Sequence, residues 1–135
     1  PLDPTEDSTI MLDFASASVG LGMSDVAMHV HHAVRPQDLA NGGEYQLVAA
    51  YLSRLHDAGI DYPEEEALRH YRFAVVDYAR FFMGRMWKGA TRETMEAKRD
   101  NRNIANINRS VTAAVAFVGR VHEYLKEIER EMDQL

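Results

Sequence analysis

Cysteine is absent from this chain of 135 residues, and membrane-length apolar runs are absent as well. Without thiols there can be no disulfide and no thiolate metal site, a composition that suits a reducing cytosol, so we expect a cytoplasmic protein. A membrane span needs roughly 20 consecutive apolar residues, and no run approaches that length, so no membrane partner is expected. Basic residues number 15 against 21 acidic ones. The resulting net charge of −6 argues against nucleic acid as a partner, because nucleic acid binding requires a basic face.

The residues that are present suffice for one compact domain. Hydrophobic residues make up 46% of the chain, enough to bury a core at this length. The acidic, proline-containing stretch 1–8 predicts a flexible segment, which leaves 9–135 as a single helical domain. The chain begins with Pro1 rather than methionine, and we interpret this as a sign of a fragment or a processed chain.

Capping residues and apolar spacing predict a mainly α fold of about five helices with one short N-terminal strand. Pro63 and the three acidic residues after it are typical of a helix start, and Gly59 is placed to end the helix before it. The predicted helices cover 24–34, 43–58, 63–87, 91–99 and 104–133.

Two of these helices carry apolar stripes at intervals of three and four residues, which predicts their buried faces. The stripe of the long central helix comprises Leu68, Tyr71, Val75, Tyr78, Phe82 and Met86. The predicted buried seam of the last helix comprises Val111, Val115, Val118, Val121, Leu125, Ile128 and Met132.

The predicted strand, Thr9 to Phe14, carries Asp13 near its end, and a turn with Gly20 and Gly22 leads to Asp25 at a helix start. A carboxylate held at the end of a buried strand can bind Mg²⁺ against a phosphate chain. The simpler alternatives are a surface turn residue for Asp13 and a helix cap for Asp25. A strand also needs a partner strand, which must come from upstream sequence or from a second copy.

Asp13-Phe14, followed by the run from Gly20 to Ala27, resembles the aminoglycoside phosphotransferase and choline kinase-like family, closest to its ecdysteroid kinase-like branch. The resemblance implies a protein-kinase-like fold, of which this chain would be the helical C-terminal part of the large lobe. It further implies that Asp13 binds Mg²⁺ on the phosphates of ATP and that Asp25, with Gly20 and Gly22, orders the active site.

The family's catalytic loop, His-x-Asp-x-x-x-x-Asn, is absent from these residues, as are its nucleotide-covering loop and phosphate-binding lysine. The resemblance therefore implies a parent phosphotransferase that moves the γ-phosphoryl of ATP to a small-molecule hydroxyl. The 135-residue chain alone is expected to be inactive, with no Mg²⁺ or ATP cofactor of its own and no catalytic residue within it.

Three residues are candidates for an acceptor-substrate cleft: His29, Arg72 and Asp77. Each has a simpler interpretation. His29 and His32 are three apart on a helix and could share a zinc ion, although no further ligand pattern accompanies them. Asp77 lies three residues before Arg80, so an ion pair within the helix is the default interpretation.

A second hypothesis comes from a different functional class. The chain could be a non-enzymatic helical association domain that forms a homo-oligomer through its exposed strand or through a helical face. A His-x-Asp-x-x-x-x-Asn motif shortly upstream of Asp13 in the parent gene would decide for the enzyme.

Overall fold

The computed structural model describes residues 17–134, and within them every regular element is a helix. The mainly α class predicted from the sequence is confirmed. The predicted strand, Thr9 to Phe14, and Asp13 lie outside the described residues. The helices are α1 (Gly22–Ala33), α2 (Pro36–Leu39), α3 (Gly43–Asp57), α4 (Glu64–Phe81), the π-helical turn η1 (Phe82–Met86), α5 (Arg92–Glu96), α6 (Asn106–Arg109) and α7 (Val111–Met132).

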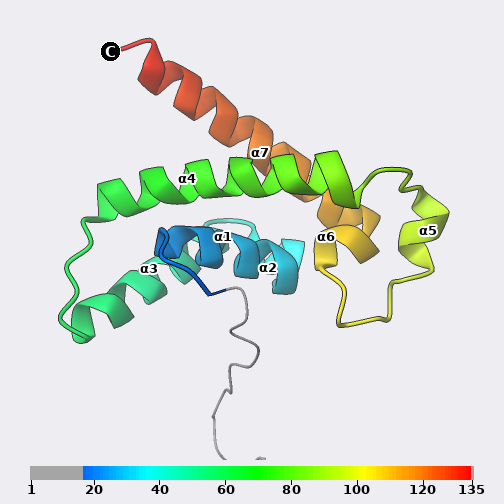
Figure 1. Ribbon diagram of the computed structural model, residues 1–135, viewed down its shortest axis with the longest axis horizontal. Coiled ribbons are helices and arrows are strands. Elements are labelled where there is room, and N and C mark those ends of the chain that lie inside the picture. Colours follow the sequence, from blue (N-terminus) through cyan, green and yellow to red (C-terminus); the bar gives the residue numbers. More distant parts are fainter. Residues whose placement is uncertain (1–16, 135) are drawn as a thin grey trace, which may run out of the picture.

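Helix α4 runs through the middle of the molecule and organises the other helices (Figure 1). It packs most extensively against α1, and α2, α3 and α6 lie on that same side of it. Helix α7 starts beside α6 and crosses α4 obliquely on the other side. The chain therefore forms two helical layers that both pack against α4, and the first half of α7 also contacts α2 and α6 directly.

The helix boundaries follow local signals, and several of them depart from the prediction. The helix predicted over 63–87 changes to a π turn after Phe81, and the one predicted over 104–133 breaks at Ser110. The Ser110 hydroxyl accepts the Ala113 N–H at 3.2 Å and so caps α7. Pro36, which follows the helix predicted over 24–34, begins the short α2, which was not predicted, because proline suits the first helical turn.

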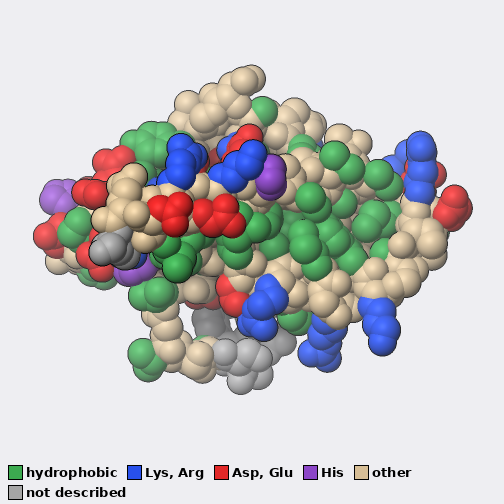
Figure 2. All heavy atoms as spheres, turned by 90° about the horizontal axis from the view of Figure 1, so that it is seen from above, with side chains coloured by type: hydrophobic (Ala, Val, Ile, Leu, Met, Phe, Trp, Pro, Cys, Tyr) green, Lys and Arg blue, Asp and Glu red, His purple; other side chains and the backbone are tan. Residues whose placement is uncertain are grey.

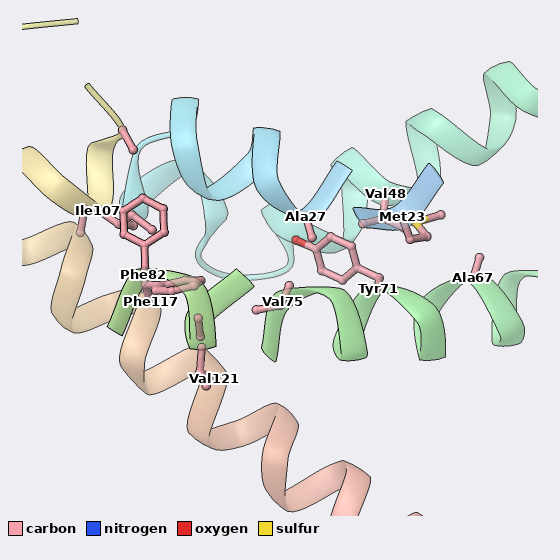
Figure 3. Close-up of a cluster of buried hydrophobic side chains, with 13 residues drawn as sticks. Met23, Ala27, Val48, Ala67, Tyr71, Val75, Phe82, Ile107, Phe117 and Val121 are labelled. Carbon is pink, nitrogen blue, oxygen red and sulfur yellow. The ribbon is translucent and has the colours of Figure 1, made fainter. Parts of the chain in front are cut away.

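The core lies along the inner side of α4 (Figure 3). Tyr71 of α4 points toward Met23 and Ala27 of α1, whereas Phe82 and Phe117 face each other nearer α6. The predicted stripe of α4 is confirmed except at Met86, which is exposed.

The buried face predicted for α7 is confirmed at Val121 and Ile128 but wrong at four other positions. Val115, Val118, Leu125 and Met132 are exposed, and Val115 is 67% exposed. Val121 and Ile128 of the predicted seam are buried, together with Ala113, Ala114 and Phe117, which the prediction did not include. Ala113, Phe117 and Val121 belong to the core, so the exposed valines lie on another face of α7. Figure 2 shows the face of the molecule on which α4 and α7 lie, and hydrophobic side chains gather over the centre of that face.

The second half of α7 extends past the packed layers and is tied to α4 by charge (Figure 1). Arg72 contacts Glu131 and lies 3.6 Å from Glu127, while Arg69 lies 3.4 Å from Glu131. These groups are partly exposed, so each pair contributes only about 0–1 kcal/mol. Within residues 17–134, no helix is long and apolar enough to cross a membrane.

Candidate functional site

Two residues that the sequence singled out share an apolar pocket between α1 and α3. Asp25 and His29 lie four residues apart on one face of α1, so both side chains border the same hollow. Its volume is about 340 Å³. The remaining lining residues are mainly apolar: Val26, Val30, Val34, Leu47 and Tyr51. We name this hollow the α1–α3 pocket.

Gly22 lies against Tyr51, one of the residues that line the α1–α3 pocket. A Cβ atom there would lie 2.5 Å from the Tyr51 hydroxyl oxygen, too close for any real contact. Glycine at position 22 therefore lets Tyr51 pack against the start of α1. Gly20 has open space around its Cα, so no close approach requires a glycine there.

Neither Ser24 nor Asp25, at the start of the helix predicted over 24–34, caps that helix. The helix begins two residues earlier, at Gly22, and its N-cap is Leu21, which makes no side-chain capping bond. Asp25 lies instead within the first turn, where its negative charge interacts favourably with the positive end of the helix dipole. The carboxylate is exposed on the rim of the α1–α3 pocket.

Arg72 and Asp77 do not lie at the α1–α3 pocket. The Asp77 carboxylate is paired with Arg80 at 2.8 Å on the exposed face of α4, the ion pair expected as the default. Arg72 belongs to the ion pairs between α4 and α7 and lines a different hollow. Of the three candidates for the acceptor cleft, only His29 therefore lies with Asp25 at the α1–α3 pocket.

A second polar site was not foreseen from the sequence. Glu44, in the first turn of α3, is only 4% exposed. Its carboxylate accepts a hydrogen bond from the Tyr71 hydroxyl at 2.9 Å and lies 2.6 Å from Arg120 Nε. His31 Nε2 lies 3.3 Å from the same carboxylate without hydrogen-bond geometry. We name these four residues the Glu44 cluster.

Two glycines at the start of α3 position Glu44 so that its side chain enters the interior. Gly42 is the N-cap of α3 and has a φ of 87°, a left-handed conformation that side chains disfavour. A Cβ atom on Gly43 would lie 1.9 Å from the Asp38 carbonyl oxygen. The start of α3 is thus held tightly against α2, and the next side chain, Glu44, enters the interior.

The Glu44 cluster holds its carboxyl group ionised. Burial alone would raise the pKa of Glu44, but His31, Tyr71 and Arg120 together outweigh it, and the pKa lies below its ordinary value. The pKa of Tyr71 is raised, first by burial and then by the Glu44 charge. Tyr71 therefore remains a neutral hydrogen-bond donor.

Two cavities flank the Glu44 cluster. One, of about 140 Å³, lies on the side of His31 and Phe117. The other, of about 250 Å³, lies on the side of Tyr71 and Tyr124. Glu44 and Arg120 line both, so an ion pair separates two small hollows. Such an arrangement can fix helix positions or orient a small polar ligand.

No group of three or more metal-ligating side chains gathers anywhere in residues 17–134. His29 and His32 are both exposed on α1. The pKa of His32 is lowered, first by burial and then by the charges of His29 and Arg109. Comparison with protein-family models, with curated proteins and with solved structures found no significant match to this chain.

Proposed function

We propose that the chain is the acceptor-binding helical part of a phosphotransferase that moves the γ-phosphoryl group of ATP to the hydroxyl of a small molecule. The observation that carries the proposal is the α1–α3 pocket. Asp25 and His29, two residues named from the sequence, both border this one hollow, and Gly22 lies against Tyr51 of its lining. Its volume of about 340 Å³ suits a small organic acceptor.

The chemistry proposed for this part of the protein is positioning. Asp13 would bind Mg²⁺ on the nucleotide phosphates, and it precedes Gly22 by only nine residues in the chain. The apolar walls of the α1–α3 pocket would bury the carbon skeleton of the acceptor. Asp25 and His29 at its rim offer a carboxylate and an imidazole to orient the polar groups of the acceptor. The catalytic base and the nucleotide lobe would come from other sequence of the parent protein.

Replacing Asp13 by asparagine in the parent enzyme is expected to lower kcat at least about 100-fold, because it removes a metal charge at the phosphates. ATP-dependent phosphorylation of amino alcohols, aminoglycosides and steroid alcohols would be followed at saturating Mg²⁺. Asp77→Asn is the matched control, since it removes the same charge from an exposed ion pair. Near-normal kcat for Asp13→Asn would exclude Asp13 from the metal site.

The same assay tests the pocket separately. His29→Ala is expected to raise the KM for the acceptor about tenfold while leaving the KM for ATP unchanged. His56→Ala is the control, because His56 is exposed at the end of α3 and outside the α1–α3 pocket. An equal effect of both variants, or an effect on ATP alone, would remove acceptor binding from this pocket.

Self-association is a second candidate function, favoured by the outward valine stripe of α7. Val115, Val118, Leu125 and Met132 are exposed at intervals of three and seven residues, the spacing of a helix–helix seam. The occupant proposed for this stripe is a second copy of the chain. The strand predicted over 9–14 would be the alternative route.

Replacing Val115 by aspartate should weaken dimerisation at least about tenfold while changing the free energy of unfolding by less than about 0.5 kcal/mol, because the residue is exposed. Sedimentation equilibrium measures the first quantity and urea unfolding the second. Met11→Pro tests the strand route. A wild-type chain that is monomeric at tens of micromolar would refute self-association.

A further inference from the structure

Four arginines converge on one hollow of about 460 Å³ in a chain whose net charge is negative. Arg35 precedes α2, Arg99 and Arg102 lie in the segment between α5 and α6, and Arg109 ends α6. Val34 and Asn106 hold these parts together, since the Asn106 amide donates to the Val34 carbonyl at 3.0 Å. We name this hollow the arginine pocket.

Arg109 is a fixed cation whose charge is not neutralised by its partners. Its guanidinium donates to the carbonyl oxygens of Ile104 at 2.9 Å and Arg99 at 2.8 Å, and to the Asn106 side-chain oxygen. All three acceptors are neutral. The bonds therefore orient the group without cancelling its positive charge.

The other arginines add charge of the same sign. Arg35 is paired with Asp38 at 2.7 Å. Arg99 and Arg102 are exposed, and no carboxylate of residues 17–134 forms an ion pair with either. Ser110 and Ala113, at the start of the 22-residue helix α7, also line the arginine pocket, where the helix dipole is positive. Three guanidinium groups without an acidic partner thus share one hollow.

We propose that the arginine pocket binds a small molecule through a diphosphate group. Guanidinium groups match phosphoryl oxygens in geometry as well as charge, because each can donate two parallel hydrogen bonds. Several cations around one hollow complement the several charges of a diphosphate better than the single charge of a carboxylate. The pocket is lined by α2, the segment before it, the segment between α5 and α6, α6 and α7, and shares no residue with the α1–α3 pocket, so the inference does not rest on the proposed phosphotransfer.

The test is isothermal titration calorimetry of inorganic pyrophosphate into the 135-residue chain at about 0.15 M ionic strength. The variant is Arg99→Gln combined with Arg102→Gln. Both side chains are exposed, and the Arg99 carbonyl that Arg109 uses remains in place. The control, Arg85→Gln combined with Lys88→Gln, removes the same charge from exposed residues outside the pocket. Melting temperatures confirm that both variants fold.

The wild type should bind pyrophosphate saturably, and the Arg99/Arg102 variant should bind it at least about tenfold more weakly, because charge-assisted hydrogen bonds are lost. The control should stay within twofold of the wild type. Orthophosphate is expected to bind more weakly than pyrophosphate, and equal affinities would refute the diphosphate assignment. Absence of saturable binding, or an equal loss in the control, would overturn the arginine pocket as an anion site.

Discussion

Replacing Glu44 by alanine is expected to destabilise the chain by about 3 kcal/mol, because removing one partner of a buried ion pair leaves the others unmatched. The Tyr71 hydroxyl loses its acceptor in the interior, and Arg120 loses its buried carboxylate partner. Arg120 is about one-third exposed and regains some hydration, which places the cost at the lower end for buried pairs. Urea unfolding measures the change.

Glu123→Ala is the matched control for this substitution. Glu123 also pairs with Arg120, at 2.6 Å, but its side chain is 61% exposed. An exposed pair contributes less than about 1 kcal/mol, so the control should change little. If Glu44→Ala and Glu123→Ala lower the free energy of unfolding equally, burial does not explain the contribution of Glu44 to stability.

The pH dependence follows from the lowered pKa of Glu44. In the unfolded chain this carboxyl titrates near its ordinary value of 4.5, and in the folded chain it titrates lower. Its stabilisation is therefore complete above that ordinary value and is lost as the pH falls through the folded pKa. Glu44→Gln removes the titrating group, so stability should fall less steeply below pH 4.5 in this variant than in the wild type.

Replacing Phe117 by alanine should cost about 4 kcal/mol, the usual loss when a buried aromatic ring leaves a cavity. Phe117 is only 2% exposed, and its ring lies 4.8 Å from His31, 6.0 Å from Tyr78 and 6.4 Å from Trp87. These three residues come from α1, α4 and the end of η1, so the ring joins both layers. The fall in melting temperature and in unfolding free energy measures the effect.

Phe81→Ala controls for the loss of an aromatic ring as such. Phe81 ends α4 and is 43% exposed, so its removal leaves no enclosed cavity and should cost less than half as much. Comparable decreases in unfolding free energy for Phe117→Ala and Phe81→Ala would mean that Phe117 does not join the two layers.

The sequence predicted the long helices well because local signals define them. Gly59, with a φ of 79°, ends α3, and the acidic residues after Pro63 begin α4, both within a residue or two of the prediction. The buried face of α7 could be predicted in this way only in part, at Val121 and Ile128. That helix carries two overlapping apolar stripes, and the packing of Ala113 and Phe117 against distant helices decides between them.

The same distinction applies to the candidate sites: residues close in sequence could be paired by prediction, and residues distant in sequence could not. Asp25 and His29 are four residues apart on one helix, so their proximity at the α1–α3 pocket could be foreseen. Glu44 and Arg120 are 76 positions apart in the chain and meet only through the tertiary fold. A glutamate in a first helical turn ordinarily faces solvent. The one local signal was the preceding pair, Gly42 and Gly43, whose close approach to α2 turns Glu44 inward.

The uneven support of α7 gives its two halves different rates of hydrogen exchange. Amides around Phe117 are closed off by the core and should exchange only when the whole chain unfolds. Beyond Leu125, the helix is held mainly by Ile128 and by partly exposed ion pairs of Glu127 and Glu131. Those last turns can unwind and rewind on their own, so the end of α7 should behave as a fraying segment attached to a core that stays closed.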